Sequence, residues 1–174
     1  MKSTQREPVI YPLGMAPKDL LTPLLGQREE TLKVFDTLTE ADLERIDDGS
    51  GWSVRAIVCH IASAELGEAF FIRSAAQGDT IHMDAATRDG FNHDEVAKTA
   101  GWSLDRCRAE LFEARETLAE VFAELTEEDL DRPIRWPEWP ARTIRTSIPY
   151  MLEHEDSHMD ELREAVERER RLAG

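Results

Sequence analysis

Residues 150–162 read Tyr150-Met151-Leu152-Glu153-His154-Glu155-Asp156-Ser157-His158-Met159-Asp160-Glu161-Leu162. The segment has neither Gly nor Pro and favours an uninterrupted α-helix. It holds two of the five histidines of the chain, spaced four residues apart. Four residues of α-helix advance about 400°, so both imidazoles leave the same face one turn apart. Two such imidazoles can chelate one divalent metal ion, most often zinc, with nickel and iron also suitable.

The apolar residues around this pair indicate which way it points. Met151, Leu162 and Ala165 share nearly the same stripe of the helix as His158, so the imidazoles are expected to face the core. Buried neutral imidazoles need polar partners, and one metal ion satisfies both. The alternative, which a bare His-x-x-x-His pair more often represents, is two surface histidines on a charged helix.

Composition restricts the class of protein. A length of 174 residues with 41% hydrophobic and 33% charged residues is typical of one globular domain rich in long helices. The net charge of −15 argues against binding nucleic acid or an anionic membrane surface. No apolar run is long enough to span a membrane, and residues 1–7 lack the apolar core of a signal peptide. Two cysteines make no disulfide framework, so a cytoplasmic protein with reduced thiols is expected.

Hydrophobic periodicity predicts four long helices, over residues 18–38, 53–78, 103–125 and 143–172. The third carries a strict apolar heptad, which is the seam of a left-handed bundle: Leu104, Cys107, Leu111, Ala114, Leu118, Val121 and Leu125. The sequence therefore predicts an all-α four-helix bundle, with Cys107 in its core rather than acting as a nucleophile.

The segments outside these helices are predicted as follows. Residues 1–17 hold three prolines and predict an extended N-terminal arm, which leaves residues 18–174 as a single bundle domain. Residues 79–101 show no clear periodicity, and a connection of this length is usually functional or a crossover. Its His82 and His93 have no histidine at chelating spacing and are not expected to reach a site.

A Pro- and Trp-rich stretch, residues 133–142, predicts a stiff apolar loop. It is expected to lid one end of the bundle or to form part of a dimer contact.

An internal repeat places a third histidine opposite the pair. Thr126-Glu127-Glu128-Asp129-Leu130 matches Thr39-Glu40-Ala41-Asp42-Leu43, a capping box with Asp in place of Glu. Each segment follows a helix-ending leucine and leads through a Trp-bearing turn to a histidine-bearing helix, which indicates one helical hairpin used twice. His60 and the pair then lie on equivalent helices, which can face each other across a pseudo-twofold bundle.

Three imidazoles leave at least one coordination position open, the pattern of a catalytic rather than a structural zinc. A metal ion held in this way lowers the pKa of a bound water or thiol. Glu65, Glu155 and Glu161 are all candidates for orienting the ring nitrogens that the metal does not use, and sequence position does not choose among them. Cys59 neighbours His60 but points about 100° away on the helix, so it is not expected to be a ligand.

Two further features each leave alternatives open. Ala64 and Gly67 make a low helix surface beside His60, which either allows another helix to approach, the favoured interpretation, or leaves space for a ligand. Arg28 lies in the apolar row of the first helix; it either extends to solvent at the edge, which is favoured, or faces an internal site.

The run from His154 to His158 also matches His-Glu-x-x-His, the metalloprotease helix, in which Glu155 would be the general base. A metzincin would need Gly and His where Glu161 and Glu164 stand, and only 16 residues follow His158. The match is therefore interpreted as accidental.

The order and spacing of these motifs resemble the DinB/YfiT-like metalloenzymes over about residues 18–170. The resemblance rests on Gly51-Trp52-Ser53-Val54-Arg55 leading to His60, on Glu65 soon after, on Phe91-Asn92, and on the distal His154-x-x-x-His158 helix. It implies an up-down-down-up four-helix bundle whose long crossover is residues 79–101. It also implies zinc or nickel bound by His60, His154 and His158, a low-molecular-weight thiol such as bacillithiol or mycothiol, and a homodimer.

The expected function is a metal-dependent enzyme, a thiol S-transferase or a hydrolase, that acts on a small-molecule substrate. The alternative is a non-catalytic bundle whose metal is structural or sensory. An acidic thiol cofactor would need basic residues near the site, for which Arg28, Arg88 and Arg142 are the candidates.

Overall fold

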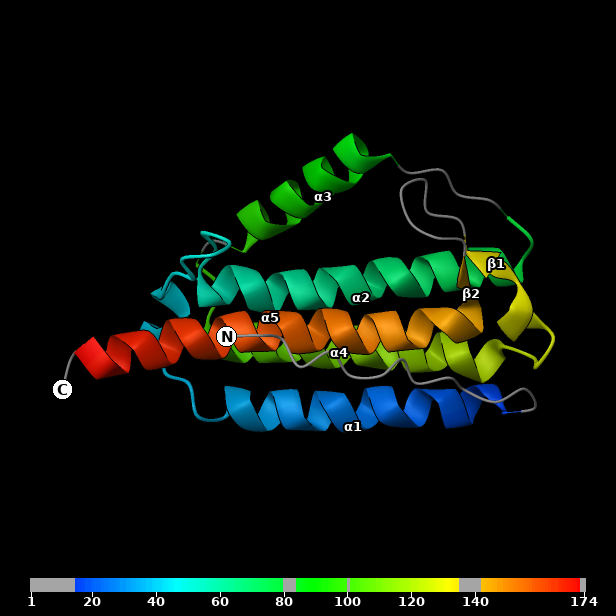
Figure 1. The fold of residues 1–174 in the computed structure, drawn as a ribbon, viewed down its shortest axis with the longest axis horizontal. Coiled ribbons are helices and arrows are strands. Elements are labelled where there is room, and N and C mark those ends of the chain that lie inside the picture. The colour runs from blue at the N-terminus through cyan, green and yellow to red at the C-terminus, as the bar shows by residue number, and fades with distance from the viewer. Residues whose placement is uncertain (1–14, 80–83, 100, 135–141, 173–174) are drawn as a thin grey trace.

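The structure is a computed structural model that describes residues 15–79, 84–99, 101–134 and 142–172. Four long helices, α1 (Pro17–Phe35), α2 (Val54–Ala76), α4 (Leu104–Glu124) and α5 (Ile144–Leu172), lie side by side as a bundle (Figure 1). Both α4 and α5 pack against α1 as well as α2. The predicted all-α four-helix bundle is confirmed, and the observed helices begin and end within a few residues of the expected bounds.

The four bundle helices have an up-down-down-up topology. In Figure 1 the colours show that α1 and α5 run in one direction and that α2 and α4 run in the other. Since α2 and α4 are parallel and follow one another among the four bundle helices, the connection between them must return along the length of the bundle. The crossover expected at residues 79–101 makes this return.

This crossover contains a helix that sequence periodicity missed. The helix α3 (Ala85–Lys98) begins after Asp84, whose carboxylate accepts a hydrogen bond of 2.8 Å from the Thr87 N–H. It packs against the outside of α2 (Figure 1). None of its described side chains is fully buried, so no apolar stripe at helical spacing marks it in the sequence. The lack of periodicity in residues 79–101 therefore gave no sign of a helix over residues 85–98.

Two apolar clusters fill the two ends of the bundle. One joins the start of α2 to the second half of α5 and the first half of α4, and includes Leu43, Val54, Leu111 and Leu162. The other gathers around Leu24, Ile72, Leu118, Phe122 and Ile148. The predicted α4 seam supplies buried residues to both clusters, and Cys107 is a fully buried core residue as expected.

The two predicted hairpin repeats share one local arrangement. Asp42 accepts hydrogen bonds from the N–H and hydroxyl of Thr39, at 2.9 and 2.8 Å, and Asp129 accepts the same pair from Thr126, at 2.9 and 2.6 Å. These boxes open the short 3-10 helices η1 (Glu40–Glu44) and η2 (Asp129–Asp131).

An extended pairing follows in both repeats before the second helix. Ile46 pairs with Ser53 ahead of α2, and β1 (Pro133–Ile134) pairs antiparallel with β2 (Arg142–Thr143) ahead of α5. Because α2 and α5 are in contact, the two histidine-bearing helices face each other as the repeat predicted.

Most of the predicted N-terminal arm, residues 1–14, most of the predicted apolar loop, residues 135–141, and His82 lie outside the described residues. Among the described helices, none combines the length and the apolar composition that crossing a bilayer requires.

Candidate metal centre and its cavity

The turn before α2 places Trp52 next to the candidate metal site. Gly51 has φ +74°, a left-handed conformation that residues with a Cβ rarely adopt, and it turns the chain into Trp52. The backbone of Trp52 is then fixed, since its carbonyl accepts a 2.8 Å hydrogen bond from the Asp47 N–H. Ser53 caps α2 by accepting a hydrogen bond from the Ala56 N–H, as predicted.

His60, His154 and His158 come together between α2 and α5. One ring nitrogen of each lies within 4.8 Å of those of the other two. The ring centroids are 5.2 Å apart for His60 and His154, 4.7 Å for His60 and His158, and 4.6 Å for His154 and His158. In a tetrahedral zinc site with Zn–N bonds of about 2.1 Å, ligand atoms are roughly 3.4 Å apart, so small side-chain adjustments would close the set around one ion.

The donor chemistry of the cluster also fits a divalent metal. His60 is 6% exposed, and its Nδ1 is buried with no hydrogen-bond partner in the described structure. Burial, reinforced by His158 and His154, lowers the pKa of His60 to about 3. Burial and His158 lower the pKa of His154 to about 4, against an opposing contribution from Glu155. Both imidazoles are therefore neutral at pH 7 and have lone pairs to donate.

Two neighbours orient the rings. The Nδ1 of His158 is 2.8 Å from a carboxylate oxygen of Glu161, which leaves Nε2 for a metal. Trp52 lies edge-on to His60, with centroids 4.8 Å apart, and is stacked on His158 at 6.1 Å. Of the three carboxylates that the sequence could not separate, Glu161 is therefore the one that contacts a histidine ring.

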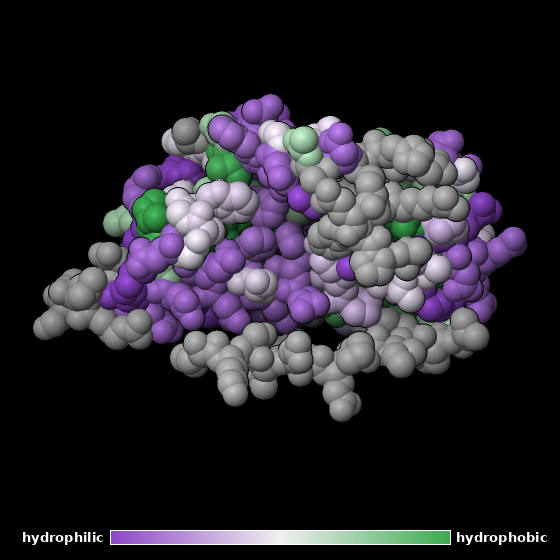
Figure 2. All heavy atoms as spheres, turned by 45° about the horizontal axis from the view of Figure 1, so that its top comes forward, coloured by the Kyte–Doolittle hydropathy of each residue, from purple (hydrophilic) through white to green (hydrophobic). Residues whose placement is uncertain are grey.

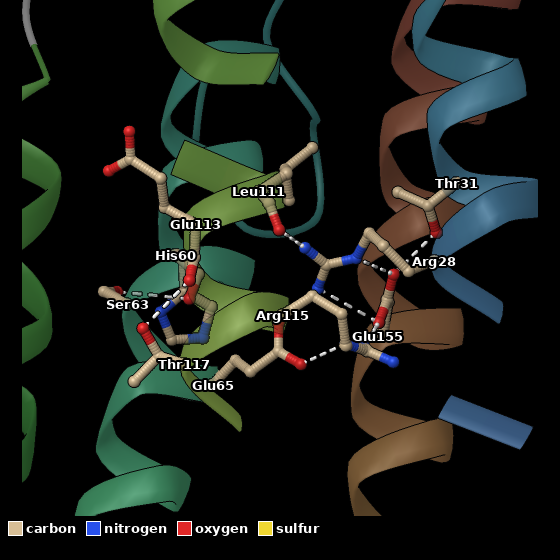
Figure 3. Close-up of polar contacts among 10 residues, drawn as sticks. All are labelled: Arg28, Thr31, His60, Ser63, Glu65, Leu111, Glu113, Arg115, Thr117 and Glu155. Atoms are coloured by element: carbon tan, nitrogen blue, oxygen red, sulfur yellow. Dashed lines mark hydrogen bonds and ion pairs between the residues drawn. The ribbon is translucent and has the colours of Figure 1, made fainter. Parts of the chain in front are cut away.

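The other two carboxylates belong to a buried ion-pair network (Figure 3). Arg28 of α1 donates to Glu65 of α2 at 2.6 Å and to Glu155 of α5 at 3.0 Å. Arg115 of α4 pairs with Glu65 and donates to Glu155 at 2.8 Å. Thr31 donates its hydroxyl to Glu155 at 2.6 Å. All four helices of the bundle thus meet at one polar layer between the two apolar clusters.

This network corrects one expectation. Arg28 was expected to extend to solvent, but it is 3% exposed and contacts both glutamates and the carbonyl of Leu111. Arg28 does lie in the apolar row of α1 that the sequence indicated. Its charge is tolerated in the core because two buried carboxylates compensate it.

The same contacts exclude the metalloprotease role for Glu155. Burial would raise the pKa of this carboxyl, but the guanidiniums of Arg28 and Arg115 outweigh burial and hold the pKa below its ordinary value. A carboxylate fixed by two arginines and a threonine is not placed to take a proton from water at the histidines. The interpretation of the His-Glu-x-x-His match as accidental agrees with this geometry.

A cavity of about 560 Å³ opens beside the histidines. Its walls come from all five α-helices and include His60, His154 and the four charged residues of the network. Ala64 and Gly67 also line it, so the low helix surface beside His60 makes room for a ligand, and the favoured expectation of a closely approaching helix was wrong. From α3 come Arg88, Phe91 and Asn92. Figure 2 shows the face on which α3 lies as mainly hydrophilic, with hydrophobic residues in small separate patches.

The remaining candidates lie apart from the cluster. Cys59 is buried, and the cluster of ligand atoms in the described structure does not include it. His93 is exposed on α3. Arg28 and Arg88 line the cavity, whereas the guanidinium of Arg142 lies 4.0 Å from the ring centroid of Tyr150.

Sequence reasoning missed Arg115 and gave Trp52 no role at the histidines. Arg115 directly follows the seam residue Ala114, a position that looks like the charged edge of a heptad. Trp52 precedes the N-cap of the His60 helix, and an aromatic residue held there by the Gly51 turn was the available signal.

The fold and the donor set define a four-helix-bundle protein with a three-histidine candidate metal site. The chain belongs to the DinB superfamily, whose family model matches residues 24–162. No curated protein matches the chain in sequence.

Two solved folds are similar to it. YfiT from Bacillus subtilis, described as a probable metal-dependent hydrolase with an unusual four-helix bundle topology, is 15% identical with a TM-score of 0.75. The match covers 94% of this chain and 93% of YfiT. The mycothiol-dependent maleylpyruvate isomerase is 12% identical with a TM-score of 0.72. That match covers 85% of this chain but only 61% of the isomerase, so the chain spans about three fifths of that protein's length. At these identities the likeness establishes the fold.

Replacing His158 with Ala tests the site directly. Because the variant removes one of three donors, we expect its affinity for zinc to fall at least about 100-fold, with the helical circular dichroism unchanged. His93→Ala, which removes an exposed histidine of α3, is the matched control and should bind zinc as the native protein does. Equal zinc affinity in His158→Ala and the native protein would contradict the assignment.

Acid should destabilise the metal-free protein through the same histidines. The pKa values of His60 and His154 are lower in the folded chain than the ordinary 6.5, so below pH 6.5 the unfolded chain binds more protons. The two histidines therefore lower the free energy of unfolding as the pH drops from 6.5 toward 4, by up to about 1.4 kcal/mol per pH unit each. Glu68, whose pKa burial raises to about 7, acts in the opposite direction and offsets part of this slope. Urea titrations between pH 7.5 and 5 measure this slope. A His60→Gln/His154→Gln variant lacks the contribution of both histidines and should be destabilised less by acid than the native protein; an unchanged slope would contradict the explanation.

Proposed function

We propose that this protein is a metal-dependent enzyme, a thiol S-transferase or a hydrolase, that acts on a small molecule bound in the cavity beside His60, His154 and His158. One observation carries the proposal: neutral histidines from two helices converge at the wall of a cavity of about 560 Å³. A structural metal site is closed by protein ligands, whereas this cluster adjoins space that a substrate could occupy.

The donor set suits zinc or nickel, because imidazole nitrogens bind both. A divalent ion on three imidazoles would supply a Lewis acid that ionises a bound thiol or water. The protein's own residues would perform the remaining tasks. Glu161 holds the His158 ring, and Trp52 covers His60 and His158. The apolar wall residues, among them Phe71 and Met151, would limit water around the reacting groups.

The comparisons support both reaction types without choosing between them. YfiT is described as a probable metal-dependent hydrolase, and the isomerase depends on mycothiol. A transferase would need room for a thiol as well as an electrophile, and the volume of about 560 Å³ lies within the usual range of small-molecule sites. We further propose the homodimer that the family resemblance implies; its interface is not needed to form the histidine cluster.

The test is a turnover screen of the metal-loaded protein. Zinc-loaded and nickel-loaded native protein would be incubated with electrophiles plus mycothiol, bacillithiol or cysteine, and separately with ester and amide substrates, and the products followed by mass spectrometry. We expect at least one substrate class to turn over with the metal, and the His158→Ala rate to be at least 100-fold lower. The His93→Ala variant should retain the native rate.

Two outcomes would contradict the proposal. Turnover at the native rate in His158→Ala would place the chemistry elsewhere. Metal binding without turnover across the whole screen would favour a structural or sensing role for the metal.

A further inference from the structure

Most of the unpartnered buried polar atoms of the described structure lie around one cavity. Four buried side-chain atoms of the described structure have neither a hydrogen bond nor an ion pair: Gln27 Oε1, His60 Nδ1, Glu68 Oε2 and Arg115 Nη1. The last three belong to residues that line the cavity beside the histidines. Because buried polar groups in native proteins are nearly always satisfied, this clustering indicates that a bound molecule completes them.

Arg115 offers a donor to such a molecule. The side chain is 5% exposed; its Nε pairs with Glu65, and its Nη2 donates to Glu155 at 2.8 Å. These two contacts fix the plane of the guanidinium and leave Nη1 without an acceptor. An oxygen acceptor of the ligand would satisfy it, and a carboxylate makes the stronger, charge-assisted bond.

Glu68 offers the complementary acceptor. It lies on α2 two turns beyond His60, is half-buried, and has a buried Oε2 without a hydrogen-bond partner. Burial raises the pKa of this carboxyl to about 7, although Arg142 opposes the shift. An ammonium group of a ligand would restore the charged carboxylate and bond to it.

The charges around the cavity favour a ligand that carries both signs. Its lining includes three arginines and four glutamates: Arg28, Arg88 and Arg115 against Glu65, Glu68, Glu95 and Glu155. With these charges nearly balanced, a ligand with only a negative charge gains little net attraction, whereas a zwitterion can satisfy both open positions.

We propose that the cavity binds an amino-acid-like molecule, with its acid group on Arg115 Nη1, its amine on Glu68 and its reacting group toward the three histidines. This inference rests on the proposed function for the reacting group, but the two contacts are independent of a metal ion.

The experiment measures the binding of a series of molecules in which the distance between the acid group and the amine varies. The unbranched ω-amino acids from glycine to 6-aminohexanoate would be titrated into ¹⁵N-labelled zinc-loaded protein and followed by amide chemical shifts. Each is compared with the unbranched carboxylate and the amine of the same length. We expect at least one amino acid to bind about tenfold more tightly than both of its one-ended counterparts. If no length shows this preference, the inference is overturned.

Two variants test which residue binds the acid group of the ligand and which binds its amine. Glu68→Gln should lower the affinity of the preferred amino acid to that of the matching carboxylate and leave carboxylate binding unchanged. Arg115→Lys keeps the charge of the network and should weaken both probes; circular dichroism checks that it folds. The matched control is Glu113→Gln, which removes an exposed carboxylate of α4 outside the cavity and should keep the native preference. An equal preference in Glu68→Gln and the native protein would also overturn the inference.

The same titration in metal-free His158→Ala separates this inference from the proposed function. A preference that persists there supports the ligand class even if no turnover is found. Turnover in the native protein without any amino-acid preference would leave the enzyme proposal standing and remove the ligand class.

Discussion

The buried network of Arg28, Arg115, Glu65 and Glu155 is the constraint on which the site depends. It has one charged residue from each of the four bundle helices, and each arginine contacts both glutamates. Removing one member would leave a buried charge uncompensated, at a cost of about 3–5 kcal/mol. The network therefore fixes the register of α2 against α5, and with it the histidines. Glu155 directly follows His154, and Glu65 lies five residues beyond His60.

The chain topology explains why a cavity lies beside this network. The up-down-down-up order makes α2 and α4 parallel, so the connection between them must cross the whole bundle, and α3 forms within it (Figure 1). The helix α3 lies on the outside of α2, and none of its own described side chains is fully buried. It therefore encloses the cavity rather than filling it. The bundle supplies rigid positions for the histidines, and the crossover supplies one wall of the cavity.

The sequence predicted what periodicity and spacing encode. The α4 seam, the two capping boxes and the four-residue spacing of His154 and His158 each depend on local order, and the structure agrees with all three. Contacts between residues that are distant in the sequence could not be predicted in this way. Arg28 was expected at the surface because its glutamate partners lie 37 and 127 residues away, where no local pattern connects them. The helix α3 was missed because it lacks an apolar stripe, and the role of Arg115 became visible only once four helices were packed.

The most direct test of the central claim, that His60, His154 and His158 bind one metal ion, is X-ray absorption spectroscopy of the zinc-loaded protein. We predict one zinc per chain with three imidazole nitrogens at about 2.0–2.1 Å, an exchangeable oxygen ligand and no sulfur. Fewer than three imidazoles, or a sulfur ligand at about 2.3 Å, would contradict the claim. The latter result would implicate Cys59 or Cys107, which lie buried on α2 and α4.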